Sequence, residues 1–158
     1  MILRFAIALV LYFGACSCSN TKKYLAFVPA APEFINAEAA APLGPYSSVV
    51  RAGDLVFTAG IIGFDAKTGA FAKPNIEAQT EQVFDNLEAA LASAGAHLED
   101  LVKVTIFLKS PADVQGMNAV YQKRIGDSRP ARTTVPGADW GRDDILIEIE
   151  AIAVCRCE

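Results

Sequence analysis

The sequence predicts one α/β (α+β) domain whose elements follow in the order β-β-α-β-α-β-β. The chain has 158 residues, of which 53% are hydrophobic and 20% are charged, so it is long and apolar enough for one core. Short β-type runs flank two segments with helical periodicity. Because two helices can cover only one face of such a sheet, we expect the other face to bind a partner chain in an oligomer.

The domain is expected to open with a pair of strands. Residues 47–52 and 55–62 are short β-type runs, and Gly53-Asp54 between them is a hairpin turn signal. The DAKTG sequence at residues 65–69 predicts a second turn before the chain reaches the first helix.

The first helix is predicted to follow Asn75, whose side chain is suited to cap it. Glu77 in the first turn is favourable at the positive end of the helix dipole. Gly95 is expected to stop the helix. Side chains for the core recur at steps of three and four residues: Ile76, Thr80, Val83, Phe84, Leu87, Leu91 and Ala94.

A strand over residues 101–109 and a second helix are expected next. Alternation in the strand places Val102, Val104, Ile106 and Leu108 on one buried face. Ser110 and Pro111 form a helix start, and Gly126 forms a stop. The predicted buried stripe of this helix is Val114, Met117, Tyr121 and Ile125.

The last two strands are predicted at residues 131–135 and 145–154. Alternation in the final strand places Glu148 and Glu150 on one face, roughly 7 Å apart at about 3.3 Å per residue. A carboxylate in so apolar a strand is costly to bury and its pKa is easily moved, so both residues are candidate proton carriers. The alternatives are solvated acids on an edge strand, or acids that pair with Lys or Arg.

Arg132 is the candidate for holding an anion. Pro130 restricts the preceding Arg129 to extended conformations, and Arg132 then enters a short strand beside two threonines. A guanidinium fixed among hydroxyl and backbone N–H groups is suited to bind a carboxylate through two hydrogen bonds. The alternatives are an ordinary surface arginine or a partner for one of the glutamates.

A third candidate is Tyr46, which follows the turn formed by Gly44-Pro45. Its ring and hydroxyl suit a binding pocket, although packing into the core at the start of a strand is an equally simple interpretation.

Composition argues against several other classes of function. A net charge of −4 does not favour nucleic-acid binding, because phosphate backbones are bound by basic surfaces. One histidine, His97, and four cysteines do not form a pattern typical of a metal site. We therefore expect no metal and no cofactor.

The start of the chain has the pattern of an export signal. Residues 1–15 contain Arg4 followed by an uncharged apolar run that is too short to span a bilayer but suits a signal peptide. Cys16 follows Gly14-Ala15 and is a candidate for lipidation, which would anchor the protein to a membrane. Residues 16–41 are expected to be a tether, and residues 42–158 the domain. We expect an exported, periplasmic or membrane-anchored protein; if the start codon is misassigned, the alternative is a cytoplasmic one.

Several motifs together resemble one known family. In order, they are GPYS, TAGII with the DAKTG turn, IEAQTEQVFDNLEAAL, KVTIFL, MNAVY, RPART and IEIEAIAV. This order is similar to the RidA (YjgF) family of reactive-intermediate deaminases. The resemblance spans about residues 42–154. It implies a chorismate-mutase-like protomer, a homotrimer with clefts between subunits, and hydrolysis of 2-imino acids to 2-oxo acids and ammonia.

The resemblance also implies roles for individual residues. Arg132 corresponds to the residue that binds the substrate carboxylate, and Glu148 to the residue that holds the attacking water. Tyr46 and Asn118 correspond to pocket residues. The backbone N–H groups of Gly60 and Thr134 correspond to further substrate contacts.

The sequence departs from the family at the second strand and in one loop. Ala59 and Ile61 replace the usual serine and glutamine, and the loop at 136–142 is longer and contains Trp140. We expect Trp140 to reshape the pocket entrance. These departures leave two alternatives to the imine deaminase: a trimer that binds small carboxylic acids without catalysis, and a ribonuclease, which the negative charge disfavours.

Overall fold

The computed structural model describes residues 31–155. The predicted signal peptide, the candidate lipidation residue Cys16 and most of the predicted tether lie outside the described residues. Within residues 31–155, no helix is both long enough and apolar enough to cross a membrane.

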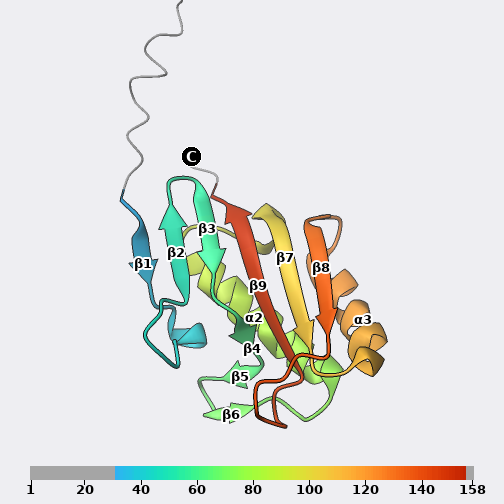
Figure 1. The fold of residues 1–158 in the computed structure, drawn as a ribbon. Coiled ribbons are helices and arrows are strands. Elements are labelled where there is room, and N and C mark those ends of the chain that lie inside the picture. Colours follow the sequence, from blue (N-terminus) through green and yellow to red (C-terminus); the bar gives the residue numbers. More distant parts are fainter. Residues whose placement is uncertain (1–30, 156–158) are drawn as a thin grey trace, which may run out of the picture.

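The main sheet has seven strands in the order β1-β2-β3-β9-β7-β8, and the short strand β4 also pairs with β9 (Figure 1). Neighbouring strands are antiparallel except for β7 and β8, which are parallel. The bounds are β1 (Glu33–Ile35), β2 (Val49–Ala52), β3 (Leu55–Thr58), β4 (Ile61–Ile62), β7 (Leu101–Leu108), β8 (Ala131–Pro136) and β9 (Ile147–Val154). A separate two-stranded sheet contains β5 (Phe64–Asp65) and β6 (Ala70–Phe71).

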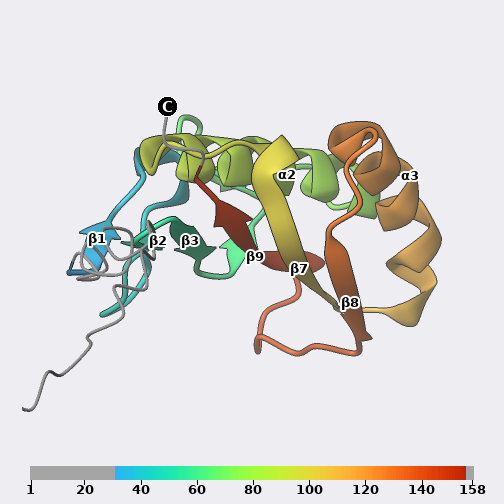
Figure 2. The ribbon, with the colours of Figure 1, turned by 90° about the horizontal axis from the view of Figure 1, so that it is seen from above.

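Both long helices lie on one face of the main sheet, as predicted (Figure 2). They are α2 (Ile76–Ser93) and α3 (Val114–Ile125), and three short 3-10 helices are η1 (Glu38–Ala40), η2 (Leu98–Asp100) and η3 (Pro111–Asp113). Helix α2 begins where the Asn75 side chain accepts a hydrogen bond from the Ala78 N–H at 2.8 Å. It ends before Gly95, whose φ of 77° is a conformation that residues with a Cβ rarely adopt. The core lies between α2 and the helix-facing side chains of β7 and β9.

Two predicted strands differ in detail from the structure. Val102 was expected on the buried face of β7, but it is 44% exposed, because the pairing with β9 shifts between Leu101 and Lys103. Leu101 is buried in its place. The predicted strand 55–62 is interrupted at Ala59-Gly60, so that β3 and β4 both pair with β9 but as separate pieces.

The sheet also extends into the segment predicted as a tether. Strand β1 pairs antiparallel with β2, and Phe34 lies opposite Val50. Ser48 fixes this segment: its buried Oγ accepts the Ala37 N–H at 2.8 Å and donates to the Ile35 carbonyl at 3.3 Å. The ordered fold therefore begins before the predicted boundary at residue 42.

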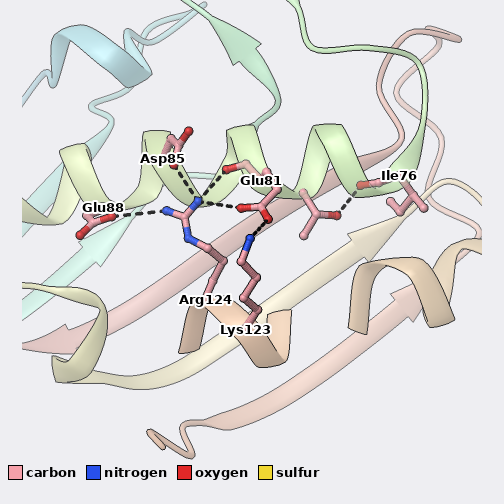
Figure 3. A network of polar contacts seen from close by, with 7 residues as sticks. Ile76, Glu81, Asp85, Glu88, Lys123 and Arg124 are labelled. Carbon is pink, nitrogen blue, oxygen red and sulfur yellow. Dashed lines mark hydrogen bonds and ion pairs between the residues drawn. The ribbon is translucent and has the colours of Figure 1, made fainter. Parts of the chain in front are cut away.

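An ionic network joins the two long helices (Figure 3). Arg124 of α3 donates to three acids of α2: Glu81 at 3.0 Å, Asp85 at 2.7 Å and Glu88 at 3.4 Å. Lys123 adds a bond of 2.9 Å to Glu81. These bonds hold α3, and with it the residues that flank β8, against α2.

Candidate active site

Glu148 lies on the face of the sheet that no helix covers. Its strand neighbours Ile147 and Ile149 are fully buried and face the helices, so alternation along β9 directs Glu148 to the opposite side. The side chain is partly buried, between exposed Glu150 and the loop that precedes β9. This confirms the predicted alternation and leaves one carboxylate in a less solvated position than the other.

Gly60 packs directly against the Glu148 side chain. A Cβ at this position would overlap the Glu148 carboxyl group, starting with Oε1, so the close approach requires a glycine. Gly60 and Tyr46 both line a mostly apolar cavity of about 110 Å³. The same cavity is lined by Ala59 and Ile61, the positions where the sequence departs from the family's usual serine and glutamine.

Trp140 contacts Glu148 in a way that the sequence did not indicate. Its indole Nε1–H donates to Glu148 Oε2 at 2.7 Å. Trp140 lies in the loop between β8 and β9, which runs along the sheet face away from the helices (Figure 2). The sequence singled out Trp140 only because its loop is longer than usual in the family, and that observation did not indicate which residue it contacts.

The pKa of Glu148 is raised above its usual value. Burial is the main cause, the Trp140 hydrogen bond opposes it, and the negative charge of Glu150 adds to it. A carboxyl group with a raised pKa can take up and return a proton closer to neutral pH than an exposed one.

Arg132 belongs to β8 and lies on the helix side of the sheet. Its Nη1 donates to Asn118 Oδ1 of α3 at 2.8 Å, and its guanidinium lies 4.6 Å from the centre of the Tyr121 ring. The side chain is otherwise exposed. One predicted pair of site residues, Arg132 and Asn118, is therefore in direct contact.

A second cavity adjoins Arg132. It has a volume of about 300 Å³ and is lined by Arg129, Arg132 and Tyr121 among others. The Tyr121 hydroxyl is buried and has no hydrogen-bond partner among the described residues. Burial raises the pKa of Tyr121, while the two arginines act in the opposite direction. The two arginines make this cavity suited to an anion.

The predicted site residues thus form two groups on opposite faces of the sheet. In the register, Arg132 is opposite Val104, and Glu148 is opposite Phe107, three residues further along β7. An odd spacing along a strand reverses the face. Thr134, opposite the buried Ile106, is on the same face as Arg132, whereas Tyr46 and Gly60 are with Glu148. One copy of the chain does not bring the two groups together.

Among residues 31–155, no group of three or more histidine, cysteine or acidic residues is placed to bind a metal ion. Cys155, the free cysteine of this part of the chain, is buried, and its thiol contacts the Gly95 carbonyl at 3.1 Å.

Comparison with known proteins agrees with the fold and with the motifs. The model of the family described as Endoribonuclease L-PSP matches residues 36–155. A RutC family protein of Pyrococcus horikoshii is 47% identical over 112 residues, which are 71% of this chain and 88% of that protein. A Salmonella typhimurium protein named 2-iminobutanoate/2-iminopropanoate deaminase is 40% identical over 121 residues, 75% and 93% of the two chains.

The solved structures agree as well. The crystal structure of the YjgF gene product of E. coli superposes with a TM-score of 0.72 at 38% identity, covering 78% of this chain and 99% of that one. Since the family model matches most of the chain and the relatives are covered over most of their length, this chain belongs to the RidA/YjgF family.

Proposed function

We propose that this protein hydrolyses 2-imino acids of the 2-iminobutanoate and 2-iminopropanoate type. Water adds to the C=N carbon, the C–N bond of the resulting carbinolamine breaks, and a 2-oxo acid and ammonia are released. The observation that carries the proposal is the half-buried Glu148 carboxyl group with a raised pKa, packed against Gly60, which itself lines an apolar cavity. The name of the Salmonella relative supports the same reaction.

Glu148 is assigned the proton transfers. In its charged form it orients a water and accepts a proton as the oxygen attacks the imine carbon. It returns this proton to the nitrogen, which gives a carbinolamine with one hydroxyl and one amino group. Glu148 then accepts the hydroxyl proton and passes it to the nitrogen as the C–N bond breaks and the C=O bond forms, so that ammonia rather than amide ion leaves. No redox step or external group is needed for this balance.

Arg132 is assigned the substrate carboxylate. Asn118 and the Tyr121 ring hold the guanidinium, and its remaining N–H groups are left for an anion. Fixing the carboxylate would set the distance of the imine carbon from the water. The cavity of about 300 Å³ that Arg129 and Arg132 line supports an anionic ligand there.

We further propose that each site is completed by two copies of the chain in a homotrimer. Arg132 and Glu148 face opposite sides of one sheet, so a single copy cannot present both to one small molecule. The helix-free face also has large apolar side chains that are more than a third exposed, which a partner subunit would cover: Leu55, Phe57 and Val154.

The test is imine hydrolysis with the purified protein. An amino-acid oxidase generates 2-iminopropanoate in the assay, and semicarbazide traps whatever imine the protein has not hydrolysed. We expect the protein to suppress the trapped product, and Arg132→Ala and Glu148→Gln each to lower kcat/KM at least about 100-fold, as loss of a positioning group or a general base does. Full activity in Arg132→Ala would contradict the assigned carboxylate site.

A second candidate is a trimer that binds small carboxylic acids without turning them over. It is favoured by Ala59 and Ile61, which make the cavity beside Glu148 more apolar than the family's usual serine and glutamine would. Binding of 2-oxobutanoate that depends on Arg132, without hydrolysis of any imine tried, would establish this candidate instead. An endoribonuclease, as in the family description, is not proposed, because a net charge of −4 does not suit RNA binding.

A further inference from the structure

We propose that Trp140 is the positioning residue of Glu148: its indole N–H holds one carboxylate oxygen and leaves the other for the attacking water. The inference rests on the proposed function, and it goes beyond it, because the residue comes from the loop in which this chain departs from its family. The sequence pattern did not assign Trp140 and Glu148 to each other.

The two oxygens of the Glu148 carboxyl group have different neighbours. Oε2 accepts the Trp140 Nε1–H at 2.7 Å. Oε1 is the Glu148 atom nearest to the position that a Cβ on Gly60 would occupy, and Gly60 in turn lines the apolar cavity. The Trp140 hydrogen bond thus engages one oxygen of the carboxyl group, and we assign the other, on the Gly60 side, to the attacking water.

The loop that carries Trp140 is anchored at several points. Ala138 N–H donates to the Leu108 carbonyl at 2.9 Å, and Lys109 Nζ reaches the Arg142 carbonyl at 3.1 Å. Near the other end, the buried side chain of Gln79 donates to the Asp144 carbonyl at 2.7 Å and accepts the Leu146 N–H at 2.9 Å. An indole on an anchored loop requires little reorganisation to keep its hydrogen bond through the reaction.

An indole suits this role because it only donates. It does not titrate and it has no acceptor, so it favours the charged carboxylate without competing for the proton. Its hydrogen bond lowers the pKa of Glu148, against the effect of burial and of Glu150. Trp140 would therefore favour the charged form of a partly desolvated base.

Three cations of the neighbouring strand and loop have partners other than Glu148. From β7, Lys103 Nζ donates to Thr133, and from the loop, Lys109 pairs with Asp143 and Arg142 with Asp144. Glu150 of the same strand is the charged residue that affects the pKa of Glu148. Tyr46 lines the adjoining cavity, with its hydroxyl accepting the Leu43 N–H.

The first test uses fluorescence, because Trp140 is the single tryptophan of the chain. Protonation of Glu148 changes the charge beside the indole N–H, so we expect the emission of the full-length protein to titrate with pH. The titration should disappear in Glu148→Gln and persist in the control Glu99→Gln, which changes an exposed acid. An unchanged titration in Glu148→Gln, or none in the parent, would overturn the contact.

The second test is the pH profile of kcat/KM. Trp140→Phe keeps an aromatic side chain but removes the N–H donor. The acid limb of the kcat/KM profile, where Glu148 becomes protonated, should therefore move to higher pH, with KM little changed. Glu150→Gln removes a neighbouring negative charge and should move the same limb to lower pH. Equal profiles for Trp140→Phe and the parent would overturn the positioning role. A parent without hydrolase activity but with a Glu148-dependent emission titration would contradict the proposed function and support the contact.

Discussion

Individual side chains in this protein take their properties from what the fold places beside them. Glu148 and Glu150 are two residues apart on one face of β9, yet the first is half-buried against Gly60 and Trp140 while the second is exposed. The sequence indicated that both were candidate proton carriers. The family resemblance selected Glu148, and the local packing gives the physical difference between the two, because desolvation raises the pKa of Glu148.

The raised pKa of Glu148 predicts a pH-dependent cost to stability. Its charged form is less favourable in the folded chain than in the unfolded chain, where the pKa is near 4.5. The folded protein therefore loses stability as pH rises through the raised pKa. We expect Glu148→Gln to have a higher Tm than the parent at pH above that value, with the difference vanishing as pH falls toward the unfolded value.

Calorimetry over a pH series would measure this effect, with Glu99→Gln as the exposed control. A lower Tm in Glu148→Gln at neutral pH, or a gain that does not change with pH, would show that burial of the charge is not what moves the pKa.

Ser48 is a second residue whose effect depends on burial. Ser48 is only 1% exposed, and its Oγ forms hydrogen bonds with the backbone of both Ala37 and Ile35. We expect Ser48→Ala to lower the free energy of unfolding by about 1–3 kcal/mol, because the buried Ala37 N–H loses its acceptor. Urea unfolding would measure it, and the neighbouring Ser47→Ala should change stability by less than about 0.5 kcal/mol. Equal effects of the two changes would argue that β1 is not fixed through Ser48.

At the scale of elements, the contact between α2 and α3 is partly ionic. The Arg124 side chain is only 16% exposed and lies over the Phe84 ring at 5.5 Å, while its guanidinium reaches three acids. The hydrogen bond from Lys123, which has the larger effect, and the one from Arg124 lower the pKa of the Glu81 carboxyl group. The position of α3 matters for the site, since Asn118 and Tyr121 of this helix contact the Arg132 guanidinium.

Removing the central cation should loosen this pair of helices. We expect Arg124→Met to cost about 1–3 kcal/mol, because it keeps an apolar stem but leaves three acids without their shared partner. Lys123→Met is the matched control: its side chain is 73% exposed, so the loss should stay below about 1 kcal/mol. Urea unfolding at low and raised salt would compare the two variants. A larger loss of unfolding free energy in Lys123→Met than in Arg124→Met would refute the central role of Arg124.

At the scale of the whole molecule, the sheet has two dissimilar faces. One is covered by helices (Figure 2). The other presents Glu148 together with exposed apolar side chains. Arg132 and its neighbours face the helix side at the β8 edge. The arrangement predicts that one chain supplies Arg132 and an adjacent chain supplies Glu148 to each site.

Subunit mixing tests this arrangement. Arg132→Ala and Glu148→Gln are each expected to be inactive alone. If they are unfolded and refolded together in equal amounts, each site has a one-in-four chance of receiving both intact residues, so about a quarter of the parent activity should return. Native mass measurement on the same samples should give trimers. Mixed trimers without regained activity would mean that both residues act from one chain.

The sequence by itself determined the elements that have a strong local signal. Helix α2 runs from the Asn75 cap to Gly95 as its 3.6-residue period indicates, and β9 alternates as predicted, because these patterns record burial residue by residue. The motifs were also sufficient to identify the family. The break of the second strand at Gly60 and the exposure of Val102 were not predictable, because pairing register depends on the partner strand rather than on the strand alone.

The tertiary structure alone decided which residues meet. Trp140 and Glu148 are eight residues apart, one in the loop before β9 and the other in β9. No helical or strand periodicity therefore predicts that their side chains meet. The family resemblance assigned Arg132 and Glu148 to clefts between subunits, and the sheet register places the two residues on opposite faces of one chain. Local sequence fixes which way a side chain points along its own strand, whereas contacts between elements depend on the register and on the path of the loops, which only the folded chain defines.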